Sequence, residues 1–361
     1  MNIESANQLT ATLKMKPLLL LPLLLGQVFL QTSSDEGVIY YVKPLQHTHP
    51  TTNCPGQPCE TLQYYLDNVN KTINQQKNVT MIFMNGNHTV NFTQVNITAP
   101  VFKMTGEILG MNAKVNCAQM TCYSCCTIEF SSTVAVCIEN LVIRSLDMLM
   151  EKPSRLSQLT TKFQLLSVKL YYSFFGFSMT QTHFQEVIFF DVVVYSDSVS
   201  NTTFSRCIFQ SSSVSLHHIM KVAMEDCQLL NTDTSLQEST IIFSGVTTLA
   251  ANNHTSAIIS YLSNITFSGN ISFINNTGVT EGAIALYSST LNLAAGANVI
   301  FINNSAQDKG GALYIEPGIT PNMIMSVITP SCFYYLWNCN CLLYTSPSPR
   351  DATLSRMPSS A

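Results

Sequence analysis

Residues 267–316 read FSGNISFINNTGVTEGAIALYSSTLNLAAGANVIFINNSAQDKGGALYIE, and they contain one short pattern twice. The first copy is Phe273-Ile-Asn-Asn-Thr277 followed by Gly282-Ala-Ile284. The second copy is Phe301-Ile-Asn-Asn-Ser305 followed by Gly311-Ala-Leu313, so the two halves recur after 28 and 29 residues. A period of this length is typical of proteins in which one repeated unit stacks on the next.

Each copy contains two short apolar stretches, at 271–274 and 283–287 in the first and at 298–302 and 312–315 in the second. No segment between them has the spacing of a helix, which argues against a strand–helix–strand unit. Short strands joined by brief turns and restacked at a fixed period form a coil of parallel strands. We therefore predict an all-β fold, a right-handed parallel β-helix.

The residues between these strands predict corners of the coil. Asparagine tolerates the left-handed backbone conformation, and its side chain can bond to a neighbouring coil. Glycine fits where a Cβ would clash. We expect Ala283 and Ala312 to face inward beside the glycines. The predicted corner residues are Asn275, Asn276, Gly282, Asn303, Asn304, Gly310 and Gly311.

The FINN(S/T) and GGA(I/L) patterns resemble the FxxN and GGA(I/L/V) repeats of polymorphic outer-membrane proteins. They are also similar to the wider class of secreted, pectin-lyase-like parallel β-helix proteins. The resemblance covers about fifty residues. Its first copy has Glu281 where the second has Gly310. The resemblance implies architecture and surface exposure, and its motifs carry no catalytic residue.

The N-terminal segment, residues 1–33, has the pattern of a secretory signal peptide. Lys14 and Lys16 precede an apolar stretch at 17–30, and small polar residues follow it. The apolar stretch is shorter than a comfortable membrane span. An uncleaved anchor is the alternative, and Met15 is an alternative start. We expect a secreted or cell-surface protein.

Residues 36–72 predict a strand and a short capping helix before the β-helix. Leu62, Tyr65, Leu66 and Val69 have the spacing of one apolar helical face. A terminal unit of this kind covers the open end of a solenoid core. The β-helix itself is predicted over residues 78–340.

The cysteines predict disulfides, because the protein is expected in an oxidising compartment. Zinc is the alternative, but CxxxxC lacks a second ligand pair, and adjacent Cys125 and Cys126 cannot easily bind one ion. Cys54 and Cys59 are predicted to pair across a small loop, and the spacing of the other candidates does not determine their pairing. The candidates are Cys54, Cys59, Cys117, Cys122, Cys125, Cys126, Cys137, Cys332 and Cys339.

The middle of the chain gives weaker signals. Residues 190–192, 206–208 and 226–228 align as one recurring corner, which places Cys207 and Cys227 on adjacent coils as small buried residues. Residues 148–182 lack clear glycines, so we expect a longer loop there. His88 follows an Asn-Gly turn, and we interpret it as a corner residue.

Residues 341–361 resemble translated read-through of a sequencing-library adapter, with CLLYTS, PSPRD and SRMPSSA around a short variable stretch. We exclude this tail from fold reasoning. On this interpretation the β-helix is truncated near Asn340.

Asn-x-Ser/Thr acceptors are frequent, as expected of a secreted glycoprotein. Only 11% of residues are charged and the net charge is −4, so nothing indicates a nucleic-acid partner. Partners would be extracellular proteins or glycans, and membrane association stays open. The acceptors are Asn70, Asn78, Asn87, Asn91, Asn96, Asn201, Asn253, Asn264, Asn270, Asn275 and Asn303.

No catalytic, metal or cofactor motif stands out. Glu225-Asp226 is the only adjacent acidic pair in the predicted coil, and neighbouring strand residues point to opposite faces. His217-His218 has the same geometry. We predict a structural or adhesive, non-catalytic protein. The alternatives are a polysaccharide lyase or hydrolase, indicated by two carboxylates in one groove, and a receptor ectodomain.

Overall fold

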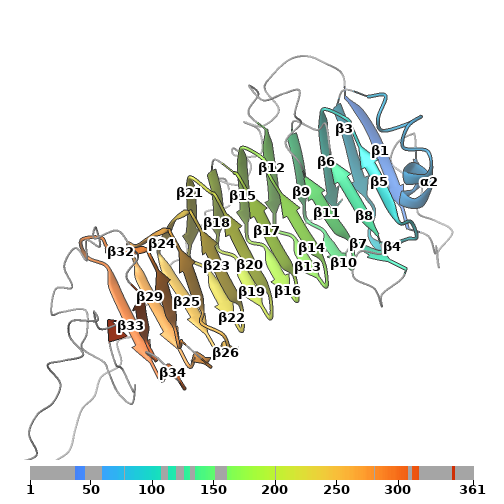
Figure 1. The fold of residues 1–361 in the computed structure, drawn as a ribbon. Coiled ribbons are helices and arrows are strands. Elements are labelled where there is room, and N and C mark those ends of the chain that lie inside the picture. Colours follow the sequence, from blue (N-terminus) through green and yellow to red (C-terminus); the bar gives the residue numbers. More distant parts are fainter. Residues whose placement is uncertain are drawn as a thin grey trace, which may run out of the picture. The chain divides into compact units, whose positions relative to one another are not determined.

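The computed structural model describes residues 37–44, 59–76, 78–106, 113–118, 126–130, 135–150, 161–199, 201–279, 281–307, 311–316 and 344–345. Every strand pair among them is parallel, and the strands form three long sheets, A, B and C, with a short sheet D (Figure 1). The chain passes from sheet A to B to C and then returns to A one position further along. With the right-handed crossovers that parallel strands adopt, this is the right-handed parallel β-helix that the repeat predicts.

Sheet A contains twelve strands. In spatial order they are β2 (Cys59–Thr61), β1 (Val38–Lys43), β3 (Asn78–Phe83), β6 (Val101–Gly106), β9 (Ala135–Glu139), β12 (Lys162–Leu166), β15 (Gln181–Gln185), β18 (Asn201–Ser205), β21 (Lys221–Glu225), β24 (Thr240–Ser244), β28 (Asn264–Phe267) and β32 (Thr290–Leu293).

Sheet B contains ten strands. They are β4 (Gly86–Val90), β7 (Ala113–Cys117), β10 (Val142–Arg144), β13 (Lys169–Tyr171), β16 (Ile188–Phe190), β19 (Ile208–Gln210), β22 (Gln228–Leu230), β25 (Val246–Ala250), β29 (Asn270–Ile274) and β33 (Asn298–Ile302).

Sheet C contains eleven strands and sheet D contains three. Sheet C consists of β5 (Gln94–Ile97), β8 (Thr127–Phe130), β11 (Asp147–Met150), β14 (Phe174–Phe177), β17 (Val193–Asp197), β20 (Ser213–His217), β23 (Asp233–Gln237), β27 (Ile258–Tyr261), β31 (Ile284–Tyr287), β35 (Leu313–Glu316) and β36 (Tyr344–Thr345). Sheet D consists of β26 (Asn253–His254), β30 (Thr277–Gly278) and β34 (Ser305–Ala306).

The most regular coils lie in the middle of the chain. Gln181 pairs with Asn201 and Asn201 pairs with Lys221, so one coil takes 20 residues. A single residue with positive φ makes each corner of such a coil. In the coil that begins at β15 these are Glu186, Asp191 and Ser198, with φ of 55°, 53° and 57°. One left-handed residue is enough to redirect the chain between two extended strands.

The core follows from the two-residue period of the strands, because alternate side chains point inward and stack on the same position of the next coil. Phe184 stacks on Phe204 with ring centroids 4.6 Å apart, and Phe189 stacks on Phe209 at 4.5 Å. All four rings are fully buried. Burying a phenylalanine contributes about 1.5–3 kcal/mol, so these ladders stabilise the coil along its whole length.

A second ladder, of polar side chains, lies inside the corner between sheets B and C. The residue after the left-handed one is buried, and its side chain accepts the backbone N–H of the same position in the preceding coil. Val192 N donates to Ser212 Oγ over 3.2 Å. Asn252 N donates to Asn276 Oδ1 over 3.2 Å, and Asn276 N donates to Asn304 Oδ1 over 3.0 Å. These backbone N–H groups at the corner therefore have hydrogen-bond acceptors within the protein and need no water.

The N-terminal part contains α2 (Leu62–Asp67), a shorter helix than the apolar spacing suggests. Thr61 caps it, because the Thr61 side chain accepts from the N–H of Tyr64. Leu62, Tyr65 and Leu66 are buried against the core, and the Tyr65 ring lies 4.8 Å from that of Tyr40. The helix covers apolar side chains of the first coil, as a capping unit should.

Two expectations about the middle of the chain are wrong. Residues 161–179 do not form a loop, because β12, β13 and β14 make a regular coil there. Residues 190–192 are not equivalent to residues 206–208 and 226–228, although the latter two segments are equivalent to each other. Asp191 makes the corner after sheet B, whereas Arg206 makes the corner after sheet A, where its equivalents are Glu186 and Asp226.

His88 is a buried strand residue of β4, not a corner residue. Its ring packs edge-on against Phe83, and its Nε2 lies 2.7 Å from the Met84 carbonyl oxygen. Burial lowers the pKa of His88. Cys207 and Cys227, by contrast, do lie on adjacent coils and are fully buried, as the spacing of 20 residues predicts.

Candidate ligand-binding groove

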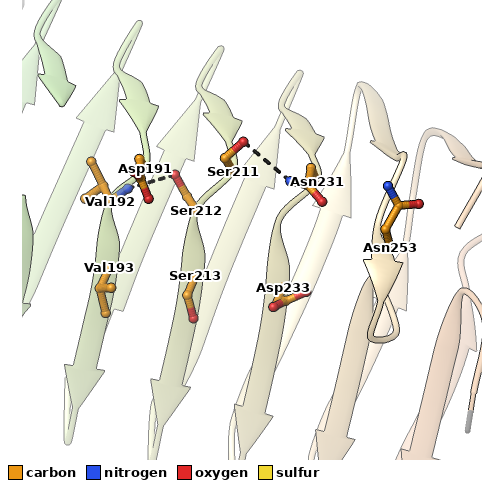
Figure 2. A pocket seen from close by; sticks show the side chains of 9 residues that line it. All are labelled: Asp191, Val192, Val193, Ser211, Ser212, Ser213, Asn231, Asp233 and Asn253. Atoms are coloured by element: carbon orange, nitrogen blue, oxygen red, sulfur yellow. Dashed lines mark hydrogen bonds between the residues drawn. The ribbon is translucent and has the colours of Figure 1, made fainter. Parts of the chain in front are cut away.

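A groove of about 270 Å³ runs along the corner between sheets B and C (Figure 2). It crosses four successive coils. The lining residues are Asp191, Val192, Val193, Ser211, Ser212, Ser213, Asn231, Asp233 and Asn253. Most of them present hydroxyl, amide or carboxylate groups.

The corner backbone positions the groove's outer wall. Asp191, Ser211 and Asn231 occupy the same corner position in three coils, with φ of 53°, 51° and 49°. This conformation is unusual outside glycine, and asparagine and aspartate tolerate it best. Because consecutive coils lie about 4.8 Å apart, the three side chains form a row of polar groups at that spacing.

The polar groups are already partly organised. Asn231 Nδ2 donates to Ser211 Oγ over 3.4 Å, as Figure 2 shows. The Thr255 hydroxyl donates to the Asp233 carboxylate. Ser212 Oγ donates to backbone carbonyls and accepts from Val192 N, so it supports the wall from within. The groove can therefore offer both donors and acceptors to a ligand rich in hydroxyl groups.

Two carboxylates share the groove, which sequence reasoning did not anticipate. Asp191 lies at the corner of one coil and Asp233 begins β23, two coils further along. Two coil spacings separate them by roughly 10 Å. This distance is close to the largest separation of the two catalytic carboxyl groups in inverting glycosidases, and it is about twice their separation in retaining glycosidases. Asp233 is exposed and Asp191 is half-exposed.

An aromatic ladder adjoins the groove on its N-terminal side. The Tyr171 ring lies 5.7 Å from that of Phe190, and Tyr172 packs edge-on against Phe190 at 5.8 Å. The guanidinium of Arg144 lies 5.0 Å from the centre of the Tyr171 ring. Tyr172 is 51% exposed, and Phe190 directly precedes Asp191. The groove thus continues into a partly exposed aromatic surface.

The predicted glycan acceptors all lie at the surface. Ten of the eleven asparagines are exposed and Asn78 is half-buried. Asn253 lines the groove itself, where the Asn253-His-Thr255 acceptor overlaps the contact between Thr255 and Asp233. None of the acceptors is needed for core packing.

The predicted repeat corners divide into two structural roles. Asn275 and Asn303 are exposed and adopt φ of 55° and 51°. Asn276 and Asn304, one residue later, are fully buried and belong to the polar ladder. Gly282 allows a close approach of two coils, because a Cβ there would lie 1.7 Å from the Gly311 carbonyl oxygen.

Cys117 and Cys126 form a disulfide between sheet B and the start of β8, with Cα atoms 6.0 Å apart. Cys59 is also disulfide-bonded. The structure differs from the prediction at Cys137, which is a free thiol. Cys137 points outward from β9, and its ladder neighbours are Lys103 and Gln164, neither of which is a cysteine. Burial raises the pKa of Cys137 to about 12.

Some predicted residues lie outside the described residues. They are the signal segment 1–33, Cys54, Cys122, Cys125, Gly310, Cys332, Cys339 and most of the tail at 341–361. Within that tail, Tyr344–Thr345 is described as β36, which pairs with β35.

Sequence reasoning missed Asp191, Ser211, Asn231 and Asp233 as a group. Their signal was the exact 20-residue spacing of Asp191, Ser211 and Asn231. This spacing is not visible as a sequence repeat, because three different residue types occupy the one corner position. It also missed the carboxylates around His218, whose Nδ1 lies 3.0 Å from Asp197 and whose Nε2 lies 3.6 Å from Glu238.

In the described part of the chain, no group of three or more His, Cys, Asp or Glu side chains is placed to hold a metal ion. Among the same residues, no helix has the length and apolar character needed to cross a membrane.

Fold and groove together define a right-handed parallel β-helix whose corners carry polar and aromatic side chains. The comparisons with known proteins add one family. The Chlamydia polymorphic membrane protein repeat matches residues 298–316, the segment that contains β33, β34 and β35. This chain is therefore similar to that repeat over one coil. No curated protein and no solved structure matches the chain.

Proposed function

We propose that this protein is a secreted or cell-surface glycoprotein that binds a glycan, without cleaving it, along the groove between sheets B and C. The observation that carries the proposal is the continuity of an exposed aromatic ladder with a row of hydroxyl, amide and carboxylate groups. A sugar ring has apolar C–H faces and a rim of hydroxyls, so it needs both kinds of surface.

The surface location is supported by three independent features. The signal-peptide pattern at residues 1–33 predicts export. The glycan acceptors lie on exposed positions. One coil matches a repeat of polymorphic membrane proteins.

The binding role is favoured over catalysis by the setting of the two carboxylates. A general acid in a glycosidase is typically desolvated, which keeps it protonated. Asp233 is exposed, and Asp191 is only half-buried. Both are suited to accept hydrogen bonds from sugar hydroxyls in water.

Binding of the purified protein to a glycan array tests the proposal. Tyr172→Ala should weaken glycan binding at least about fivefold, because the contact of one aromatic ring contributes about 1 kcal/mol. Tyr64→Ala is the matched control, because Tyr64 is 48% exposed on α2 and lies away from the groove. Equal effects of the two substitutions, or no glycan bound at all, would contradict the proposal.

A second candidate function is hydrolysis or elimination of a polysaccharide, favoured by the presence of Asp191 and Asp233 in one groove. Their separation of roughly 10 Å leaves room for a water between a carboxylate and the sugar. If the protein is such an enzyme, the two aspartates act as general acid and general base, and substitution of either one abolishes turnover.

A further inference from the structure

A second surface lies on sheet C, outside the groove, at the far end of its strands. Six residues there are register partners in consecutive coils, and we name them the C-edge row. They are Asp197, His217, Gln237, Tyr261, Tyr287 and Glu316. With about 4.8 Å between coils, the row is roughly 24 Å long.

The centre of the C-edge row is an ordered aromatic platform. Tyr261 and Tyr287 stack with ring centroids 4.8 Å apart and an interplanar angle of 12°. The Tyr287 hydroxyl bonds to the Glu281 carboxylate, which fixes that ring. Tyr261 is nevertheless 44% exposed, and Leu262 beside it is more exposed still. A preordered aromatic surface binds at a low cost in side-chain entropy.

The charge around this platform has one sign. Asp197 and Glu316 lie at the two ends of the row, and Glu238 occupies the adjoining corner. The described strands of sheet C contain no lysine or arginine. Those of sheets A and B contain Lys43, Lys103, Lys162, Lys221, Lys114, Arg144 and Lys169. The cationic groups at the row among the described residues are the imidazoles of His217 and His218, when protonated, and His218 lies between Asp197 and Glu238.

The glycan acceptors are also fewer on the described strands of sheet C than on those of sheets A and B. Asn96 in β5 is the one acceptor on a described strand of sheet C. Sheet A carries three acceptors on its strands, Asn78, Asn201 and Asn264, and sheet B carries Asn87 and Asn270. These acceptors lie outside the strands that carry the C-edge row, and the one that follows a row residue most closely in sequence is Asn264, three residues after Tyr261.

We propose that the C-edge row is a docking surface for a lysine- or arginine-rich extended segment of a partner protein. A cationic side chain would lie over the face of Tyr261 that is turned away from Tyr287, and others would pair with Asp197, Glu238 and Glu316. An extended segment of about seven residues spans the row. The same charge repels an anionic lipid surface or an acidic peptide.

Fluorescence anisotropy with an eight-residue peptide of alternating Arg and Ser tests the proposal, with alternating Glu and Ser as the control peptide. We expect saturable binding of the basic peptide that weakens steeply as salt rises, because exposed charges are screened. No saturable binding at low salt would overturn the proposal.

Charge reversal locates the site. Glu238→Lys should weaken peptide binding about tenfold, since like charges oppose docking. Glu225→Lys is the matched control, because Glu225 is exposed on β21 of sheet A and makes the same change of net charge. If the two variants lose the same affinity, the effect is one of net charge and the proposal is wrong.

Removing one ring of the aromatic platform distinguishes peptide binding at the C-edge row from glycan binding in the groove. Tyr261→Ala should weaken peptide binding at least about threefold through the lost cation–π contact and leave glycan binding unchanged. Tyr172→Ala should do the reverse. If Tyr261→Ala fails to fold, Gln237→Asn tests the same surface instead. This substitution creates an Asn-Glu-Ser glycosylation acceptor within the C-edge row.

The added glycan at residue 237 should block the peptide, with occupancy verified by intact mass. Val246→Asn is its control, since it creates an Asn-Thr-Thr acceptor on sheet B at a residue that is 63% exposed. Peptide binding that survives an occupied Gln237→Asn site would contradict the assignment to the C-edge row.

Discussion

The side-chain amide nitrogen of Asn276 donates to the side-chain oxygen of Asn304, one coil further along, over 2.8 Å. Asn276 also donates to the carbonyl oxygen of Leu249 and accepts from Asn252. Asn276 therefore connects three coils within the core.

Replacement of Asn276 by alanine should destabilise the protein by about 2–4 kcal/mol, because several buried polar groups lose their partners at once. The expected readout is a lower urea midpoint. Asn275→Gly is the control, since Asn275 is exposed with φ of 55° and glycine accepts that conformation. A similar loss in both variants would contradict the ladder.

Gly282 should not tolerate a side chain. Alanine there would place Cβ 1.7 Å from the carbonyl oxygen of Gly311, which belongs to the next coil. We expect a loss of at least about 3 kcal/mol or failure of secretion, because the backbone must move. Gly296→Asn is the comparison, since nothing lies within 4 Å of a Cβ there and asparagine tolerates its φ of 81°.

The corner ion pair between Arg206 and Glu186 should contribute little. Arg206 Nη2 lies 2.8 Å from Glu186 Oε1, but both side chains are about half exposed. Arg206→Ala should cost about 0.2–1 kcal/mol at neutral pH. Lys221→Ala is the control, because Lys221 is exposed on the same sheet and makes no ion pair in the described residues.

The pH dependence of that loss has a definite sign. The hydrogen bond from Arg206 lowers the pKa of Glu186 below its ordinary value of 4.5. A lowered carboxyl pKa stabilises the folded state above pH 4.5, and the contribution is lost as pH falls through the lowered pKa. The difference between wild type and Arg206→Ala should therefore disappear in acid. A difference that grows in acid would contradict this account.

His218 should titrate above an ordinary histidine. The hydrogen bond to Asp197 is the main cause that raises the pKa of His218 above 6.5, with a contribution from Glu238. Its stabilising effect is present below pH 6.5 and is lost as pH rises through the raised pKa. NMR titration should show Asp197→Asn moving the pKa back down and Glu225→Gln leaving it in place. An unchanged pKa in Asp197→Asn would contradict the assignment.

The fold was predictable from the sequence because Asn and Gly occupy the corners of the last coils. Phe273 and Phe301 recur at the same position, and the structure stacks them at 5.0 Å. Of the more regular 20-residue coils, only the step from Cys207 to Cys227 was recognised. Their corners are formed by residues such as Glu186, Arg206 and His218, whose types give no left-handed signal. The neighbouring coils impose that conformation.

The groove was predictable only in part. A search for adjacent carboxylates found Glu225-Asp226, and the structure uses the Asp226 side chain to accept from Val246 N. The pair that does share a groove, Asp191 and Asp233, is 42 residues apart in sequence. Only the coil period brings them together, so recognising the pair required the correct register.

The groove is proposed to bind a glycan without cleaving it. The most direct measurement is release of new reducing ends, or of unsaturated products, from an oligosaccharide that the purified protein binds. We expect binding that depends on Tyr172 and no product above the level of a boiled sample. Product formation that disappears in both Asp191→Asn and Asp233→Asn would contradict it and establish the enzyme instead.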